Sequence, residues 1–109
     1  MEQQSYQSCI DACNACATAC GNCAASCLAE QDVKAMAKCI TLDMDCALAC
    51  STAAALMSRN SQFAAAACKL CADICAACGE ECGTHEKDHC QACAKACLKC
   101  SQACLAMAA

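Results

Sequence analysis

The sequence predicts an all-α protein, an antiparallel up-down-up-down four-helix bundle whose core is lined with cysteine. Nineteen of the 109 residues are cysteine, and most follow one another at alternating steps of three and four, which places them on one face of a helix. The chain has no proline and only three glycines, so the main helix breakers are scarce. Short polar stretches divide it into four segments of similar length, and short connections make neighbouring helices antiparallel.

The first two predicted helices carry different inward faces. The first, about residues 3–29, presents a stripe of six thiols: Cys9, Cys13, Cys16, Cys20, Cys23 and Cys27. The second, about residues 32–57, follows a break at residues 30–31, and Asp32 can cap its start. Its inward face mixes thiols with other groups: Met36, Cys39, Asp43, Cys46, Cys50, Ala53 and Met57. The interior is therefore predicted to be asymmetric.

The last two predicted helices carry the same cysteine spacing. The third, about residues 61–82, starts after a turn in which Asn60 or Ser61 can act as the cap. Gly83 suits the left-handed residue that often follows a helix, and Thr84 can cap the fourth helix, about residues 85–107. The thiols are Cys68, Cys71, Cys75, Cys78 and Cys82, followed by Cys90, Cys93, Cys97, Cys100 and Cys104. Residues 1–109 are expected to form a single domain.

Composition and charge argue against several classes of function. A formal net charge of −4, seven basic residues and two aromatic residues, Tyr6 and Phe63, offer neither a basic surface nor a stacking platform for nucleic acid. The start MEQQSYQSC lacks the pattern of an export signal, and no apolar run approaches the ~18 residues of a membrane span. We therefore expect a cytoplasmic protein that does not bind membranes. Thiols directed inward, with His85 and His89 as the only histidines, indicate capacity rather than catalysis, so we do not expect an enzyme.

The thiol pattern favours a soft metal ion over disulfides. Thiols three or four residues apart on a helix have Cβ atoms ~5–6 Å apart, whereas a disulfide needs ~3.8 Å. Soft sulfur ligands select Cu(I), Zn(II) or iron–sulfur clusters, and regular helical spacing does not suit cluster-binding loops. A Zn(II) ion held by four unshared thiolates keeps a net charge of −2, whereas one Cu(I) per thiolate is neutral and less costly to bury. Many Cu(I) ions per chain are therefore predicted, with all 19 cysteines as ligands.

Two other functions fit the same residues. The protein could sequester Zn(II) or Cd(II) through shared, bridging thiolates. It could instead be a structural bundle with redox-sensing thiols, but such thiols need low pKa values beside basic residues, and the stripes have few basic neighbours. Buried cysteine acting only as a small apolar residue would explain a few of these positions but not all of them.

Three motifs make the chain resemble the bacterial copper storage proteins. They are the run CxxxCxxCxxxCxxCxxxC at 9–27 and two runs CxxCxxxCxxCxxxC at 68–82 and 90–104. The resemblance covers the whole chain and, without an export signal, favours the cytosolic branch of that family. It implies a homotetramer of four-helix bundles, Cu(I) held mainly by pairs of cysteines, and copper entry at one polar end. The sequence does not identify the copper donors and acceptors.

The two ends of the predicted bundle differ in chemistry. We call one the mouth end, where the first helix turns into the second and the third into the fourth: Cys27, Met36, Cys39, Cys82, His85, His89 and Cys90. The opposite end gathers residues expected to form an apolar plug: Tyr6, Cys9, Met57, Phe63, Cys68, Cys104 and Met107. His85, His89 and Met36 are candidate metal ligands at the mouth end, and Asp43 is a candidate ligand or proton acceptor.

Overall fold

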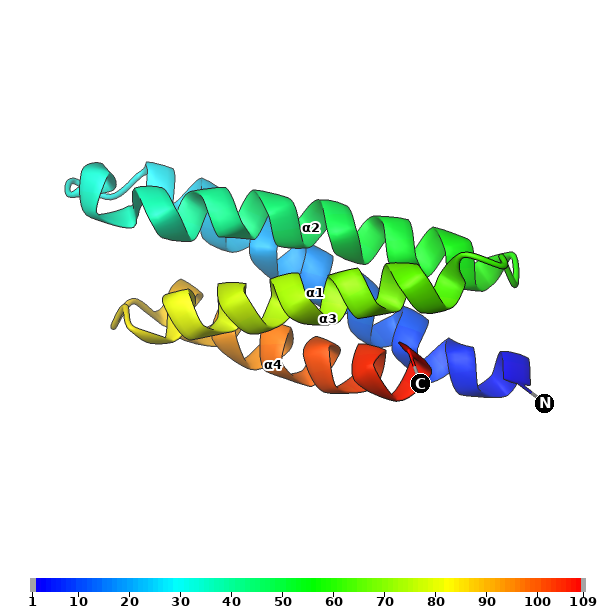
Figure 1. Ribbon diagram of the computed structural model, residues 1–109. Coiled ribbons are helices and arrows are strands. Elements are labelled where there is room, and N and C mark those ends of the chain that lie inside the picture. The colour runs from blue at the N-terminus through cyan, green and yellow to red at the C-terminus, as the bar shows by residue number, and fades with distance from the viewer. Residues whose placement is uncertain (1, 109) are drawn as a thin grey trace.

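The computed structural model describes the backbone of residues 2–108 and the side chains of residues 6–108. It contains four long helices and one short 3-10 helix: α1 (Glu2–Leu28), η1 (Val33–Met36), α2 (Ala37–Ser58), α3 (Ala64–Gly83) and α4 (Asp88–Ala108). These form an elongated antiparallel bundle of 48 × 17 × 16 Å (Figure 1). The predicted fold class is confirmed.

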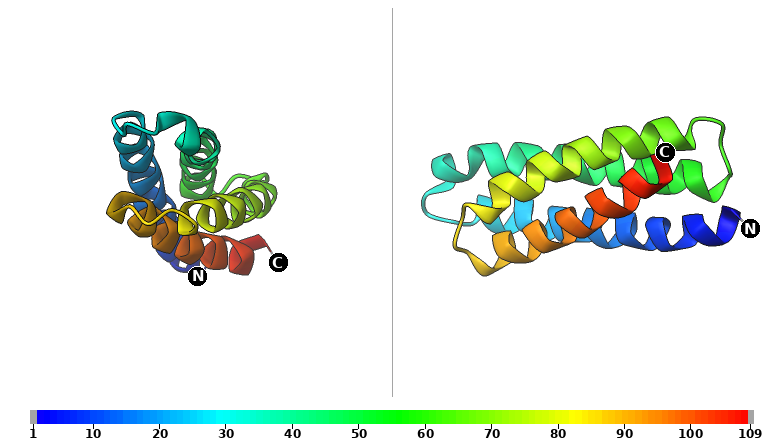
Figure 2. Two further views of the ribbon diagram at one scale, coloured as in Figure 1. Left: turned by 90° about the vertical axis from the view of Figure 1, so that its left-hand side faces the viewer. Right: turned by 60° about the horizontal axis from the view of Figure 1, so that its bottom comes forward.

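The four helices surround one shared core. α1 packs mainly against α2 and α4, and α3 packs mainly against the same two helices. The end-on view in Figure 2 shows this square arrangement. The connections α1–α2 and α3–α4 lie at one end of the bundle, which is therefore the mouth end (Figure 1).

Three helix starts differ from the predicted positions. The second helix opens as the 3-10 turn η1, and Asp32 makes no side-chain capping hydrogen bond. The third begins at Ala64 because Ser61 builds a turn in front of it: the Ser61 hydroxyl accepts the Phe63 N–H at 3.0 Å. The fourth begins at Asp88, because the Thr84 hydroxyl donates back to the Glu81 carbonyl at 2.7 Å and so closes α3 instead of capping α4.

The left-handed backbone position also differs from the prediction. Gly83 is the last residue of α3, and Thr84 after it keeps a right-handed conformation at φ −80°. Asn60, between α2 and α3, adopts the left-handed conformation with φ 53°. Asparagine tolerates this region better than most residues, so the turn after α2 needs no glycine.

The core consists mainly of sulfur. All 19 cysteines are at most 2% exposed, and the remaining seam positions predicted for α2, from Met36 through Asp43 to Met57, are buried with them. Leu48, Leu98 and other large aliphatic residues lie on the outside. Thiols therefore fill the space that hydrocarbon side chains fill in most bundles.

The segment Val33–Ser58 is long and apolar enough to cross a membrane, by length and composition only. A helix that packs in a protein core can meet the same two criteria. Ten of the segment's 26 residues are alanine or cysteine, and its thiol face is buried in the bundle together with Asp43. The segment is thus a bundle helix with a buried polar face.

Candidate metal centre

The thiols form a continuous column along the bundle axis. Thiols four residues apart on one helix approach closely, as Cys16 and Cys20 do with sulfurs at 4.0 Å. Thiols on different helices come closer still, with Sγ atoms at 3.0 Å for Cys39 and Cys82 and at 3.2 Å for Cys46 and Cys75. All 19 cysteines lie within the described residues and are free thiols. An ion in this core therefore meets sulfur from several helices at once.

Groups of four sulfurs recur along this column. In each group the four Sγ atoms all lie within 4.8 Å of one another. We call these groups quartets, and five of them are Cys13–Cys71–Cys100–Cys104, Cys16–Cys46–Cys50–Cys75, Cys16–Cys20–Cys46–Cys97, Cys20–Cys78–Cys93–Cys97 and Cys23–Cys27–Cys39–Cys90. Three of these quartets are linked by shared pairs of sulfurs: the second and third share Cys16 and Cys46, and the third and fourth share Cys20 and Cys97.

Asp43 is the one carboxylate among the buried residues of this core, within the side chains that the structure describes. It is fully buried, and its Oδ1 accepts hydrogen bonds from Cys78 and Cys93, each at 3.2 Å, and from Cys82 at 3.4 Å. Burial is the main reason that the pKa of Asp43 rises from 3.8 to about 8. The carboxyl group is therefore mostly protonated at neutral pH in the metal-free core.

Burial also affects the thiols towards both ends of the column. It raises the pKa of Cys27 to about 11, and the pKa values of Cys39 and Cys68 to about 12. These groups are neutral thiols at pH 7 when no metal is present. A metal ion that binds them must displace their protons.

His89, in the first turn of α4, faces the thiols at the mouth end. Its Nδ1 lies 3.6 Å from Cys90 Sγ, 3.7 Å from Cys23 Sγ and 3.8 Å from Cys27 Sγ. Its Nε2 lies 3.0 Å from a carboxylate oxygen of Glu30. Sequence reasoning missed Glu30, although it follows Cys27 by three residues and so continues the cysteine stripe of α1 into the turn.

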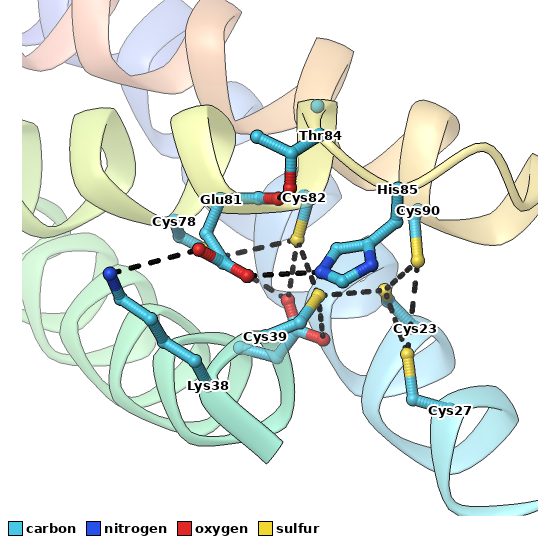
Figure 3. A network of polar contacts seen from close by, with 12 residues as sticks. Cys23, Cys27, Lys38, Cys39, Cys78, Glu81, Cys82, Thr84, His85 and Cys90 are labelled. Carbon is cyan, nitrogen blue, oxygen red and sulfur yellow. Dashed lines mark hydrogen bonds and ion pairs between the residues drawn. The ribbon is translucent and has the colours of Figure 1, made fainter. Parts of the chain in front are cut away.

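His85 points elsewhere. Its Nε2 lies 3.0 Å from Glu81 Oε2, and Glu81 Oε1 lies 3.8 Å from the Lys38 ammonium group. Figure 3 shows Glu81 between Lys38 and His85, beside the pair Cys39 and Cys82. The prediction placed both histidines at the mouth end, and the structure does bring both there, but it directs His89 towards the thiols and His85 towards a carboxylate.

The remaining predicted end residues lie as follows. Met36 is buried at the mouth end, and Met57 is buried at the opposite end. Tyr6 and Met107 pack partly buried against the core there. Phe63 is 61% exposed, because it stands just before α3 in the turn rather than on an inward helix face, so the prediction that it joins an apolar plug was wrong.

This chain is similar to one protein family and to known proteins over nearly its whole length. The family model described as copper storage protein matches residues 2–109. A cysteine-rich protein of Bacillus subtilis, YhjQ, is 50% identical over 109 residues, which is the full length of both chains. The structure of a Cu(I)-bound copper storage protein, BsCsp3, is similar with a TM-score of 0.93 and 48% identity, covering 96% of this chain and 99% of that one.

A third relative comes from Streptomyces lividans. It is described as a cytosolic copper storage protein with five coppers, and it matches with a TM-score of 0.94 and 42% identity. The match covers 97% of this chain and 93% of that chain. Both solved structures therefore agree with this chain over nearly its whole length.

Proposed function

Because this chain belongs to the copper storage protein family, we propose that it stores many Cu(I) ions as thiolates inside its four-helix bundle. The observation that carries this proposal is the column of 19 buried thiols: 16 of them belong to the five quartets named above, and three of those quartets share sulfurs. Cu(I) prefers sulfur ligands, and shared sulfurs let neighbouring ions use the same thiolates.

Charge balance supports a high copper content. Each thiol that binds Cu(I) gives up its proton, so one ion per thiolate leaves the core neutral. The neutral product matters because the column is closed to solvent, and burying an uncompensated charge costs several kcal/mol. Loading is therefore an exchange of protons for Cu(I) at nearly constant core charge.

We assign copper binding to all 19 cysteines, with His89, His85 and Met36 as candidate ligands at the mouth end. The geometry supports His89 most directly, since its Nδ1 faces three thiols. Asp43 lies against thiols of α3 and α4 and is a further candidate ligand or proton acceptor. The histidines and the charged groups around them make this the polar end, through which we propose that copper enters.

We further propose a cytoplasmic, non-catalytic protein that forms a single domain over residues 1–109 and assembles as a homotetramer. The Streptomyces lividans relative is described as cytosolic, which supports the location. Exposed leucines on three helices, Leu48, Leu70 and Leu98, offer apolar surface for contacts between subunits.

Sequestration of Zn(II) or Cd(II) is the second candidate, because the quartets also suit it. Four sulfurs within 4.8 Å of one another fit a tetrahedral Zn(II) site. Such sites accumulate negative charge unless thiolates are shared, so zinc should saturate at fewer ions than copper.

An anaerobic titration separates these functions. Fully reduced protein is titrated with Cu(I) against a chromogenic Cu(I) chelator, and in parallel with Zn(II). We expect a Cu(I) endpoint near one ion per cysteine in competition with the chelator, and an earlier Zn(II) endpoint. Saturation after a few Cu(I) ions would contradict storage, and an equally high capacity for Zn(II) would favour the alternative.

A further inference from the structure

We propose that Glu30 is a positioning residue for copper transfer, which holds His89 with its Nδ1 lone pair towards the thiols of the mouth end. This inference rests on the proposed copper storage function. It concerns a residue that lies outside the thiol column and whose side chain contacts the imidazole ring that faces the column.

The backbone places Glu30 firmly for this task. Its N–H donates to the carbonyl of Cys27 at 3.1 Å, so the turn after α1 fixes where the side chain starts. One carboxylate oxygen then meets His89 Nε2 at 3.0 Å, and the other meets the Lys87 ammonium group at 3.3 Å. Lys87 is itself held, because its carbonyl accepts the backbone N–H of Cys90 at 3.0 Å. The three side chains thus form a chain of charge-assisted contacts between the α1 turn and the start of α4.

This arrangement determines which nitrogen of His89 carries the proton. A carboxylate only accepts hydrogen bonds, so Nε2 must donate its N–H to Glu30. In the neutral ring, Nδ1 is then left with a free lone pair. That lone pair faces Cys23, Cys27 and Cys90 at 3.6–3.8 Å. A Cu(I) ion held by Nδ1 would be within reach of three sulfurs that can replace the imidazole.

His85 provides an internal comparison at the same end of the bundle. It also has a carboxylate, Glu81, on Nε2 and a lysine, Lys38, on the far oxygen. Each histidine thus belongs to a group of one histidine, one glutamate and one lysine, and the two groups differ in where the glutamate comes from. Glu81 lies only four residues before His85 in the chain, whereas Glu30 lies 59 residues before His89. The Glu81 group also reaches outside α3 and α4, through Lys38 of α2. Among the described side chains, however, only the Glu30 group holds a histidine that faces thiols of the quartet of Cys23, Cys27, Cys39 and Cys90.

The orientation has a kinetic consequence. Carboxylates that accept the second N–H of a metal-binding histidine fix its tautomer and raise its basicity, and their loss typically costs ~10–100-fold in affinity or activity. Since the storage capacity lies in the thiols, loss of Glu30 should slow copper entry without lowering the final number of ions bound.

The test compares four variants with the wild-type protein: Glu30→Gln, Glu81→Gln, His89→Ala and the double variant Glu30→Gln/His89→Ala. Anaerobic stopped-flow experiments follow Cu(I) transfer from a chromogenic chelator complex into the reduced protein. We expect about tenfold slower transfer for Glu30→Gln and His89→Ala, no further slowing in the double variant, and clearly less slowing for Glu81→Gln, whose histidine does not face the thiols.

A measurement on the metal-free protein keeps this inference separate from the storage function. Nitrogen-15 NMR of the His89 ring, recorded at mildly alkaline pH, reports directly which ring nitrogen carries the proton. The wild type should show Nε2–H alone, and Glu30→Gln should populate Nδ1–H as well, because glutamine can also donate to Nε2. Additive effects in the double variant, equal slowing by Glu81→Gln, or an unchanged tautomer in Glu30→Gln would each overturn the proposal. A low Cu(I) endpoint in the wild type would instead contradict storage.

Discussion

Raising the pH should destabilise the metal-free protein through one buried group, Asp43. The side chain is fully buried, and burial raises its pKa from 3.8 to about 8. Because the pKa in the folded state lies above that in the unfolded chain, the stabilisation is complete below about pH 4 and is lost as the pH rises through 8. Substitution Asp43→Asn keeps the shape of the side chain but cannot ionise, so it should remove this dependence.

The magnitude follows from the difference in pKa. Each tenfold change in proton affinity is worth ~1.36 kcal/mol, so a rise from 3.8 to about 8 amounts to about 5–6 kcal/mol. The free energy of unfolding of the wild type should therefore fall, relative to Asp43→Asn, by ~1.36 kcal/mol per pH unit between about pH 4 and pH 8. Comparing the two proteins cancels the contributions of the thiols, which both contain.

The assay is urea unfolding under anaerobic, reducing conditions, followed by far-UV circular dichroism at one-unit steps from about pH 4 to about pH 9. The expected result is a stability difference between the two proteins that changes steadily across this range. Parallel pH profiles would refute the reasoning, because they would mean that Asp43 ionises in the folded protein as easily as in the unfolded chain.

Three further predictions concern packing and metal removal. Gly21→Ala should stabilise the protein by about 0.5–1 kcal/mol, because nothing lies within 4 Å of the added methyl group. Gly79→Val should destabilise it by about 1–3 kcal/mol, because the added Cβ would lie 3.2 Å from the Cβ of Cys97. Urea unfolding measures both changes. Ser101→Ala should lower the free energy of unfolding by about 1 kcal/mol, because it removes a buried 2.9 Å hydrogen bond from α4 to a carbonyl of α3. The control Ser58→Ala removes an exposed hydrogen bond and should change the free energy of unfolding little. Removing copper with a chelator should leave the helical circular dichroism signal intact but lower the melting temperature, and a coil spectrum in the metal-free protein would contradict this.

The fold could be predicted because period and composition agree along the chain. Alternating steps of three and four define each inward face, and the same rule identified the seam of α2, where Asp43 and Met36 take the place of thiols. The helix starts were wrong by up to three residues, because Ser61 and Thr84 each had two hydrogen-bonding choices that the sequence does not distinguish.

The site could be predicted only in part. The sequence identified which thiols face inward, but the quartets depend on how far one helix is shifted along its neighbour, and periodicity within a helix does not fix that shift. The same limit applies to the histidines. His89 faces the thiols because of where the α3–α4 connection sets the start of α4, and Glu30 reaches it across 59 residues.

The shared sulfurs of the quartets have a consequence for movement within the core. An ion in the quartet of Cys16, Cys46, Cys50 and Cys75 can pass to the quartet of Cys16, Cys20, Cys46 and Cys97 while it keeps two of its sulfurs. From there the ion can pass to the quartet of Cys20, Cys78, Cys93 and Cys97 while it keeps Cys20 and Cys97 as ligands. Along these three quartets an ion can thus migrate without being released into water. Over this stretch, ions can redistribute as more arrive, so that filling does not depend on each one finding its final position at the first encounter.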